Sequence, residues 1–247
     1  ARRGTVDHPS GCLFSHRSWR NYYHFIVDSC LRYVDLDDQG VLVEDMRYFV
    51  HTEPIAWQAR YMFLLGIDAG RIVSSAGPCH NVGRFLVASP RKQRFAISRQ
   101  AMDSFSGRMR ERAEKIDGSP SPNIYISRAG EKSRRVLNEE ELQETLSEFG
   151  FRTLQARGMS IDRQIRLFSN ARNVIAPHGA GLANLIYSRA PNLIELIPQD
   201  RWNYGYFIPM VSMLGGTHVP ILSKAENAEE DFYVDVKVIR AHLESRG

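Results

Sequence analysis

The sequence predicts an α/β protein with parallel sheets. In its second half, short apolar runs alternate with longer amphipathic stretches, which is the pattern of repeated strand–helix units. Residues 173–195 carry this pattern most clearly, with apolar runs at 174–176 and 193–197 that enclose a glycine-containing turn and a helical stretch at 182–187. With 247 residues, 43% hydrophobic and 24% charged, the chain has the composition of one large or two smaller globular domains.

The first half predicts an irregular start followed by short elements. Residues 1–18 are polar and rich in turn formers, so they predict no regular structure. An amphipathic helix is expected next, with Asn21 as its cap and apolar residues at helical spacing up to residue 34. Strands are expected at 41–44, 48–51, 71–73 and 85–87, and helices at 54–65 and 98–116.

A linker separates the two halves. Residues 117–122 read Asp-Gly-Ser-Pro-Ser-Pro, which predicts a domain boundary between a first domain of residues 1–119 and a second of residues 120–247. Beyond the linker, strands are expected at 123–126, 151–154, 174–176, 193–197 and 217–220. Helices are expected at 138–149, 160–170, 182–187 and 206–214, and the closing segment 234–243 is expected to be helical in its later part.

The glycine turn is a candidate anion site. It comprises His178, Gly179, Ala180 and Gly181 and follows a strand, so it lies at the sheet edge where ligands bind. The glycines leave no Cβ between backbone and ligand, and the following helix directs free N–H groups to the same place, which suits a nucleotide phosphate. Asn184 occupies the position that the dinucleotide fingerprint G-x-G-x-x-G reserves for a third small residue. Such a turn also occurs without a ligand, with the histidine capping the helix.

The loop at residues 127–135 adds positive charge at the same expected edge. It also connects a strand to a helix, and it carries Arg128, Arg134 and Arg135. Guanidinium groups in this place can clamp a diphosphate through two-pronged hydrogen bonds. The alternative is a solvated basic loop.

Three further polar residues are expected near this edge. Asn138 and Glu139 stand at a helix start, where Asn138 fits a helix cap better than a ligand contact. Glu195 ends a strand, where a carboxylate can accept hydrogen bonds from ribose hydroxyls. The alternative for Glu195 is a helix-capping or ion-paired acid.

The helix after residue 21 carries a polar stripe. His24 and Asp28 are four residues apart and Asn21 is one turn earlier, so all three project from one side of the helix. The stripe is either a functional site or a surface His–Asp pair. Residues 35–37, Asp-Leu-Asp, match a motif that can hold a divalent cation against a diphosphate, but they run towards Gly40 and predict a solvated turn rather than a metal site.

Charge and cysteine content indicate which kinds of partner and which cellular compartment to expect. The net charge is +4 without a dense Lys/Arg tract, so an anionic small ligand is expected and nucleic acid is not. The three cysteines form neither a metal pattern nor a disulfide framework, which favours a reducing compartment. No signal peptide and no apolar run of about 18 residues is visible, so the cytoplasm, with or without membrane association, is expected. The chain begins with Ala1, so an upstream segment is also expected. If that segment carries a signal or anchor, the expected location of the protein is the lumen of the Golgi or endoplasmic reticulum.

Four motifs in order give a family resemblance. They are N-Y-Y-H-F-I-V-D at 21–28, Y-I-S-R with R-R-V-L-N-E at 125–128 and 134–139, P-H-G-A-G-L-A-N at 177–184, and I-E-L-I-P at 194–198. Together they resemble family 61 of the glycosyltransferases, most closely its bacterial capsular-polysaccharide branch. The family also includes plant xylan glycosyltransferases and animal O-linked N-acetylglucosaminyltransferases.

The resemblance implies a fold and an activity. The fold would be GT-B-like, with two Rossmann-like halves whose parallel sheets face each other across a cleft. The activity would be an inverting transfer from a nucleotide-sugar donor to a glycan or polysaccharide acceptor, with no metal and no other cofactor. The donor residues would be Arg128, Arg134, Asn138, Glu139, His178, Gly179, Ala180, Gly181, Asn184 and Glu195. Asn21, His24 and Asp28 would be catalytic, with the base left open between His24 and Asp28.

Two other functions compete with this one. The first is a nucleotide- or glycan-binding module of the same fold without catalysis, which differs only in lacking donor transfer or hydrolysis. The second is a nicotinamide-dependent oxidoreductase, against which the incomplete fingerprint at Asn184 argues.

Overall fold

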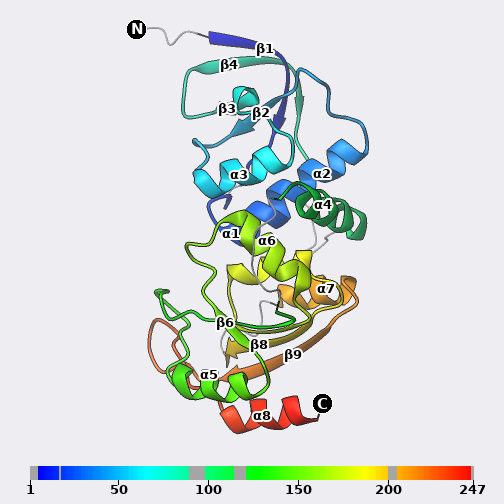
Figure 1. Cartoon of the computed structure of the whole chain (residues 1–247). Helices are drawn as coiled ribbons and strands as arrows, with labels where there is room; N and C mark the ends of the chain where they lie inside the picture. The colour runs from blue at the N-terminus through cyan, green and yellow to red at the C-terminus, as the bar shows by residue number, and fades with distance from the viewer. Residues whose placement is uncertain (1–4, 17, 89–97, 114–120, 200–204, 246–247) are drawn as a thin grey trace. The chain divides into compact units, whose positions relative to one another are not determined.

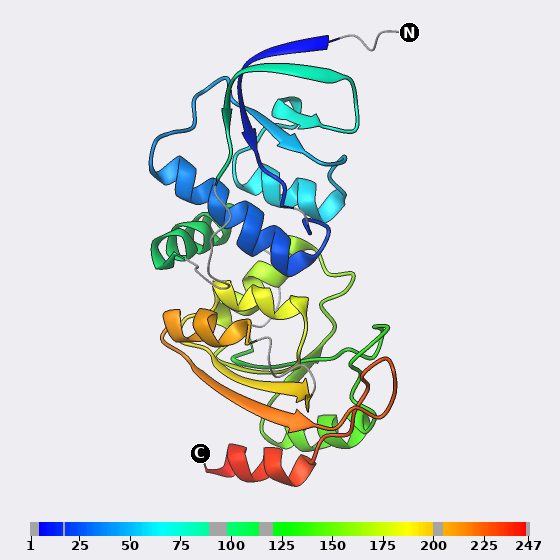
Figure 2. The same ribbon diagram turned by 180° about the vertical axis from the view of Figure 1, so that it is seen from behind.

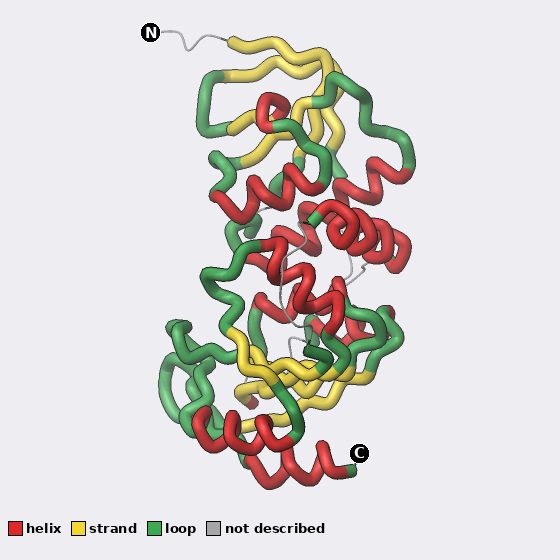
Figure 3. The backbone as a smooth tube through the Cα atoms, viewed as in Figure 1, coloured by secondary structure: helices red, strands yellow, loops and turns green. Residues whose placement is uncertain are grey.

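The chain divides into two compact units, Ala1–Ala113 and Glu114–Gly247 (Figure 1). A computed structural model of the protein describes residues 5–16, 18–88, 98–113, 121–199 and 205–245. Each unit contains strands and helices (Figure 3), and the strands of each form one parallel sheet, so the predicted α/β class with two Rossmann-like halves is confirmed. The predicted boundary between residues 119 and 120 lies outside the described residues. No helix in the described part of the chain is both long and apolar enough to cross a bilayer.

The sheet of the first unit has the strand order β3-β2-β1-β4, with every pair parallel. Its strands are β1 (Thr5–Leu13), β2 (Arg47–Val50), β3 (Ile72–Ser74) and β4 (Cys79–Leu86). Its helices are α1 (Tyr22–His24), the π-helix η1 (Phe25–Cys30), α2 (Leu31–Asp38), α3 (Ala56–Leu64), the 3₁₀ helix η2 (Ala69–Arg71) and α4 (Arg99–Arg112). Buried aromatic rings form much of the core, among them Phe25, Tyr61 and Phe105.

Three predictions for the first half were wrong. Residues 5–13 are not irregular but form β1, which pairs with both β2 and β4. This strand is polar and contains Pro9, so its local sequence does not indicate a strand inside a sheet. Residues 41–44 form no strand. The Asp-Leu-Asp segment is not a turn but lies in α2, where Asp37 and Asp38 both bind Arg108 of α4.

The sheet of the second unit has the order β6-β5-β7-β8-β9, again all parallel. Its strands are β5 (Asn123–Ile126), β6 (Arg152–Leu154), β7 (Asn173–Pro177), β8 (Asn192–Pro198) and β9 (Thr217–Ser223). Its helices are α5 (Glu139–Glu148), α6 (Ile161–Asn170), the 3₁₀ helix η3 (Ala180–Tyr187), α7 (Phe207–Met213) and α8 (Val236–Glu244). All predicted elements of this half are present, with ends that differ by a few residues.

Helices cover both faces of this second sheet (Figures 1 and 2). Residues of α5 and α8 join Tyr125, Ile175 and Ile194 of the strands in one buried cluster. The helices α6, η3 and α7 lie on the opposite face (Figures 1 and 2). Burying both faces explains why β5, β7 and β8 are continuous apolar runs rather than alternating ones.

The loop between β5 and α5 is tied to the segment before α8. The carboxylate of Asp231, fully buried, accepts hydrogen bonds from the backbone N–H of Arg135 at 2.8 Å, from its guanidinium and from Asn227. The amide of Asn138 bonds the backbone of Val234 on both sides, at 2.9 and 3.0 Å. Asn138 is the N-cap residue of α5, as predicted, but its side chain caps no backbone N–H of the first turn. Its Nδ2 instead donates to the carboxylate of Glu141 at 2.9 Å as well as to Val234.

Gly83 and Gly107 give a matched test of the first unit. A Cβ on residue 83 would lie 2.9 Å from the carbonyl oxygen of Pro9, whereas one on residue 107, inside α4, would meet nothing within 4 Å. Gly83→Ala should lower the free energy of unfolding by about 1–3 kcal/mol through the forced shift of β1 against β4. Gly107→Ala should raise it by about 1 kcal/mol through helix propensity. Urea titration of the wild type and both variants measures the free energies of unfolding. A Gly83→Ala protein as stable as the wild type would contradict the β1–β4 register.

The Asp231 anchor predicts an acid sensitivity. The hydrogen bonds from Arg135 lower the pKa of Asp231 from its usual value to about 2. A carboxyl whose pKa is lowered in the folded state contributes stability above its unfolded pKa and loses it as the pH falls through the folded one. The melting temperature of Asp231→Asn should therefore lie below that of the wild type at pH 7, and the gap should close towards pH 2. Glu148→Gln, which breaks the exposed pair with Arg240, is the control and should change little at either pH.

Candidate functional site

The strand order of the second unit creates a topological switch point between β5 and β7. The chain goes to β6 on one side of β5 and to β7, β8 and β9 on the other. In open parallel sheets, ligands bind beyond the carboxyl ends of the two strands at such a point. β5 runs directly into Ser127 and Arg128, and β7 runs into His178. The arginine loop and the glycine turn therefore start from neighbouring strand ends.

Arg128 lies against the glycine turn. Its Nε donates to the carbonyl of Ser133 at 3.0 Å, and a Cβ on residue 179 would clash with its Nη1, so glycine at 179 makes room for the guanidinium. Among the described residues, no carboxylate forms an ion pair with Arg128. Burial, and then the neighbouring charge of Arg134, lower the pKa of Arg128 to about 10. A partly desolvated cation without a counter-ion is typical of an anion site.

Arg134 is held at the same turn by an unusual backbone. Its φ of 57° lies in the left-handed region, which residues other than glycine rarely adopt. Its N–H donates to the carbonyl of Glu229 at 2.9 Å, which holds this conformation. Its Nη1 donates to the carbonyl of His178 at 2.9 Å. Strained residues of this kind cluster at functional sites, where the surrounding structure fixes them.

His178 belongs to a buried chain of three side chains. Its Nδ1 lies 2.6 Å from one oxygen of Glu195, and Nε2 of His218 lies 2.7 Å from the other. Burial opposes ionisation of Glu195, but the hydrogen bonds from the two histidines outweigh it and lower the pKa of the carboxyl. Glu195 is only 3% exposed and both oxygens already accept hydrogen bonds. Its role as a ribose ligand stays a prediction.

The other predicted donor residues hold the framework around this edge. Asn184 is fully buried in η3, where its Nδ2 donates to Gln164 of α6 and to the carbonyl of Gly181. The carboxylate of Glu139 accepts from the hydroxyl of Tyr125 at 2.7 Å. Ala180 and Gly181 begin η3, a 3₁₀ helix, directly after the turn. The structure thus brings Arg128, Arg134, His178 and Gly179 together, with Glu195 hydrogen-bonded to His178. The side chains of Asn138, Glu139 and Asn184 bond to other parts of the same unit.

A cavity lies at the other end of the strands of this sheet. It has a volume of about 620 Å³ and is lined by the first residues of four strands, Asn123, Asn173, Asn192 and Thr217. Their side chains hydrogen-bond to one another in a row, at 2.7, 2.8 and 2.7 Å. This row aligns the strand starts and is separate from the arginines.

The first unit also has a switch point, between β1 and β4, and a polar cluster follows β1. The chain continues from Leu13 through His16 into the helix that carries His24 and Asp28. Asn21 caps this helix, since its amide oxygen accepts from the N–H of Tyr23 and of His24, so the predicted cap is confirmed. The middle of the helix, Phe25–Cys30, is a π-helix that contains Asp28, and such wide turns occur frequently at functional sites.

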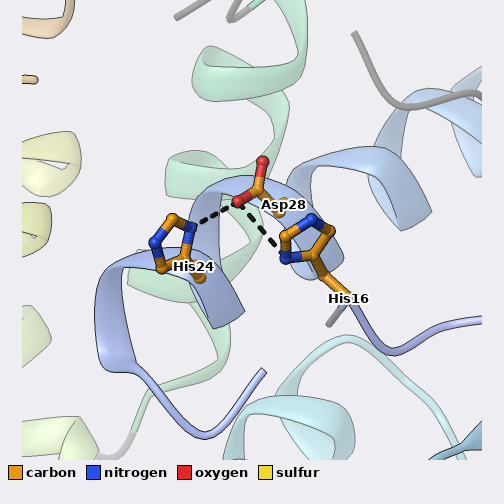
Figure 4. A group of neighbouring side chains, drawn as sticks. All are labelled: His16, His24 and Asp28. Atoms are coloured by element: carbon orange, nitrogen blue, oxygen red, sulfur yellow. Dashed lines mark hydrogen bonds and ion pairs between the residues drawn. The ribbon is translucent and has the colours of Figure 1, made fainter. Parts of the chain in front are cut away.

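Two histidines face the carboxylate of Asp28 (Figure 4). Nδ1 of His24 lies 2.7 Å from one carboxylate oxygen and Nδ1 of His16 lies 3.7 Å from the same atom. Burial opposes ionisation of Asp28, but the hydrogen bond from His24 and the nearby His16 and Arg32 together lower its pKa. One atom of each of the three side chains lies within 4.8 Å of the other two, the spacing of a cation site, and no other such group occurs among the described residues.

His16 and His218 were missed by the sequence analysis. His16 lies in a stretch that was expected to be irregular, and it reaches Asp28 only because β1 ends beside the helix. His218 was placed in a strand, but nothing local links it to Glu195, 23 positions earlier. Only the pairing of β8 with β9 brings the two together.

Comparison with known proteins identifies the family of the chain. The glycosyltransferase 61 family model matches residues 22–194, more than two thirds of the chain. The matched span contains His24 and Asp28 as well as Arg128, Arg134 and the glycine turn. No curated protein matches the chain. The chain belongs to glycosyltransferase family 61.

Proposed function

We propose that the protein is an inverting glycosyltransferase that moves a hexosyl or pentosyl group from a nucleotide-sugar donor to a hydroxyl of a glycan or polysaccharide, without a bound metal. The family supports sugar transfer. The observation that carries the donor side is Arg128, a partly buried guanidinium without an ion-pair partner among the described residues, at the strand ends where a ligand is expected.

The donor diphosphate supplies the missing negative charge. A desolvated cation is costly, and a diphosphate relieves that cost while forming charge-assisted hydrogen bonds with Arg128 and Arg134. Arg134 is already fixed to the carbonyl of His178, so the arginine and the turn would meet the ligand as one preformed unit. Preformed donors cost no reorganisation when charge develops on the leaving group. The two guanidinium groups would thus do the work that a divalent cation does in metal-dependent transferases.

The acceptor hydroxyl requires a base. In the proposal, Asp28 is ionised and holds the imidazole of His24 through Nδ1, which leaves Nε2 to take the proton. Asp28 alone would be a weak base, because its pKa is lowered. Asn21 acts as a positioning residue, because its amide fixes the helix start from which His24 projects.

The proposed reaction is a direct displacement, which uses the two arginines for the leaving group and His24 for the acceptor proton. The acceptor oxygen attacks the anomeric carbon as the bond to the nucleotide diphosphate breaks, the acceptor proton passes to His24, and the configuration inverts. Base catalysis and leaving-group stabilisation are then the two needs of the reaction. A nucleotide-binding module without transfer would share the donor site, so transfer itself must be measured.

The donor site predicts metal-independent nucleotide binding that depends on Arg128. Thermal-shift screening with UDP, GDP, ADP and CMP should find one nucleotide that stabilises the protein equally with and without EDTA. Arg128→Ala should weaken that binding about 10- to 100-fold through the lost charged hydrogen bonds. The unliganded variant should be at least as stable as the wild type, because a desolvated charge has been removed.

Arg163→Ala, an exposed arginine on α6, is the matched control and should bind like the wild type. The donor-site proposal would be wrong if no nucleotide binds, or if Arg128→Ala binds as tightly as the control.

The base predicts a loss of transfer with intact donor binding. His24→Ala and Asp28→Asn should each reduce the transfer rate by about 10²–10⁴, the range typical of a lost general base. Nucleotide affinity, measured by the same thermal shift, should stay at the wild-type level. The control is His51→Ala, which removes an exposed histidine elsewhere in the same unit and should leave the transfer rate unchanged. Full transfer activity in His24→Ala would rule out the assignment.

A further inference from the structure

We propose that His218 is a positioning residue for the donor site: it completes a hydrogen-bonded chain, His218–Glu195–His178, that orients the His178 ring towards the donor diphosphate. The inference rests on the proposed function, since it names what makes His178 a phosphate contact. It also gives Glu195 a different task from the predicted one, because Glu195 then acts on the ligand through His178 and not through the ribose.

The three members come from three adjacent parallel strands. His178 follows β7, Glu195 lies in β8 and His218 in β9, with Ala176 and Pro220 opposite Glu195 on the two sides. The side chains of His178, Glu195 and His218 are 10%, 4% and 8% exposed. Each carboxylate oxygen has its own imidazole, so the carboxylate cannot rotate without breaking both contacts. The strand register therefore fixes the direction of the His178 ring.

The other nitrogen of His178 is available to a ligand. No hydrogen bond involves Nε2 of His178 in the part of the chain that the structure describes, although the residue is only 8% exposed. Phe207 packs against the ring edge at 5.7 Å and limits its movement. With both ring nitrogens protonated, Nδ1–H donates to Glu195 and Nε2–H remains for a phosphate oxygen.

Among the described residues, two arginines and a tyrosine lie beside this hydrogen-bonded chain. The groups that face it are Arg128 and Arg134 from the loop after β5 and Tyr206 at the start of α7. Neither arginine bonds the Glu195 carboxylate among the described contacts. His178 and His218 are thus the two donors that keep this buried carboxylate ionised.

The test compares two substitutions of His218. His218→Phe keeps a ring but removes the donor, and His218→Gln keeps an N–H donor for Glu195. The probes are inorganic pyrophosphate and the nucleoside diphosphate that binds the wild type best, titrated calorimetrically between pH 5 and 8. His218→Phe should bind both probes about 10-fold more weakly at pH 7, and His218→Gln should stay within about 3-fold of the wild type. His242→Gln, on α8, is the control for histidine loss in the same unit.

The pH profile separates orientation from packing. In His218→Phe, Glu195 loses one hydrogen bond that lowers its pKa, so its pKa rises and it takes up a proton at a higher pH. Binding to His218→Phe should therefore weaken further as the pH falls, starting at a higher pH than in the wild type. Equal weakening of His218→Phe and His218→Gln at all pH values would overturn the proposal and indicate packing alone.

A ligand-free measurement keeps this inference distinct from the proposed function. With ¹⁵N-labelled histidine, the ring nitrogens of His178, assigned through His178→Asn, report which of them carries a proton. The signals should change in His218→Phe and be restored in His218→Gln. If the wild type binds no nucleotide, the proposed function fails, but these spectra still show whether His218 acts on the His178 ring through Glu195. Unchanged His178 signals in His218→Phe would overturn it.

Discussion

The parallel pairing of β5 with β7 is the constraint on which the candidate donor site depends. Ile124 lies opposite Val174 and Tyr125 opposite Ile175, and all four side chains are almost completely buried. A slip of one residue would turn these side chains to the wrong faces, so hydrophobic burial fixes the register. The register in turn fixes where the arginine loop and the glycine turn leave the sheet. The position of the charged groups is therefore a consequence of apolar packing several residues away.

Both units contain a carboxylate between two histidines, but the side chains are more exposed to solvent in the first unit than in the second. Each has a carboxylate between two histidines near a switch point: Asp28 between His16 and His24, and Glu195 between His178 and His218. The side chains around Asp28 are 25–31% exposed, whereas those around Glu195 are at most 10% exposed. An accessible imidazole can exchange a proton with a substrate hydroxyl. A buried one keeps a fixed direction, which suits contact with a leaving group.

The donor loop combines strain with firm anchoring. Arg134 has a left-handed backbone and Arg128 a desolvated charge, and each is unfavourable by itself. The neighbouring Arg135 binds the buried Asp231, and Asn138 bonds the backbone of Val234, so the loop is fixed at its far end. Proteins commonly break local rules at functional sites where the surrounding structure compensates. Here the compensation comes from residues about 96 positions away in the chain.

The sequence by itself determined the elements of the second half, the helix cap at Asn21 and the family, because these depend on local periodicity, local hydrogen bonds and motifs. It did not determine β1, whose polar sequence becomes a strand only through β2 and β4, which follow dozens of residues later. Nor did it reveal the π-helix around Asp28 or the contacts of His16 and His218. Those were decided by tertiary structure, because strand order and register, rather than neighbouring residues, bring each histidine to its carboxylate.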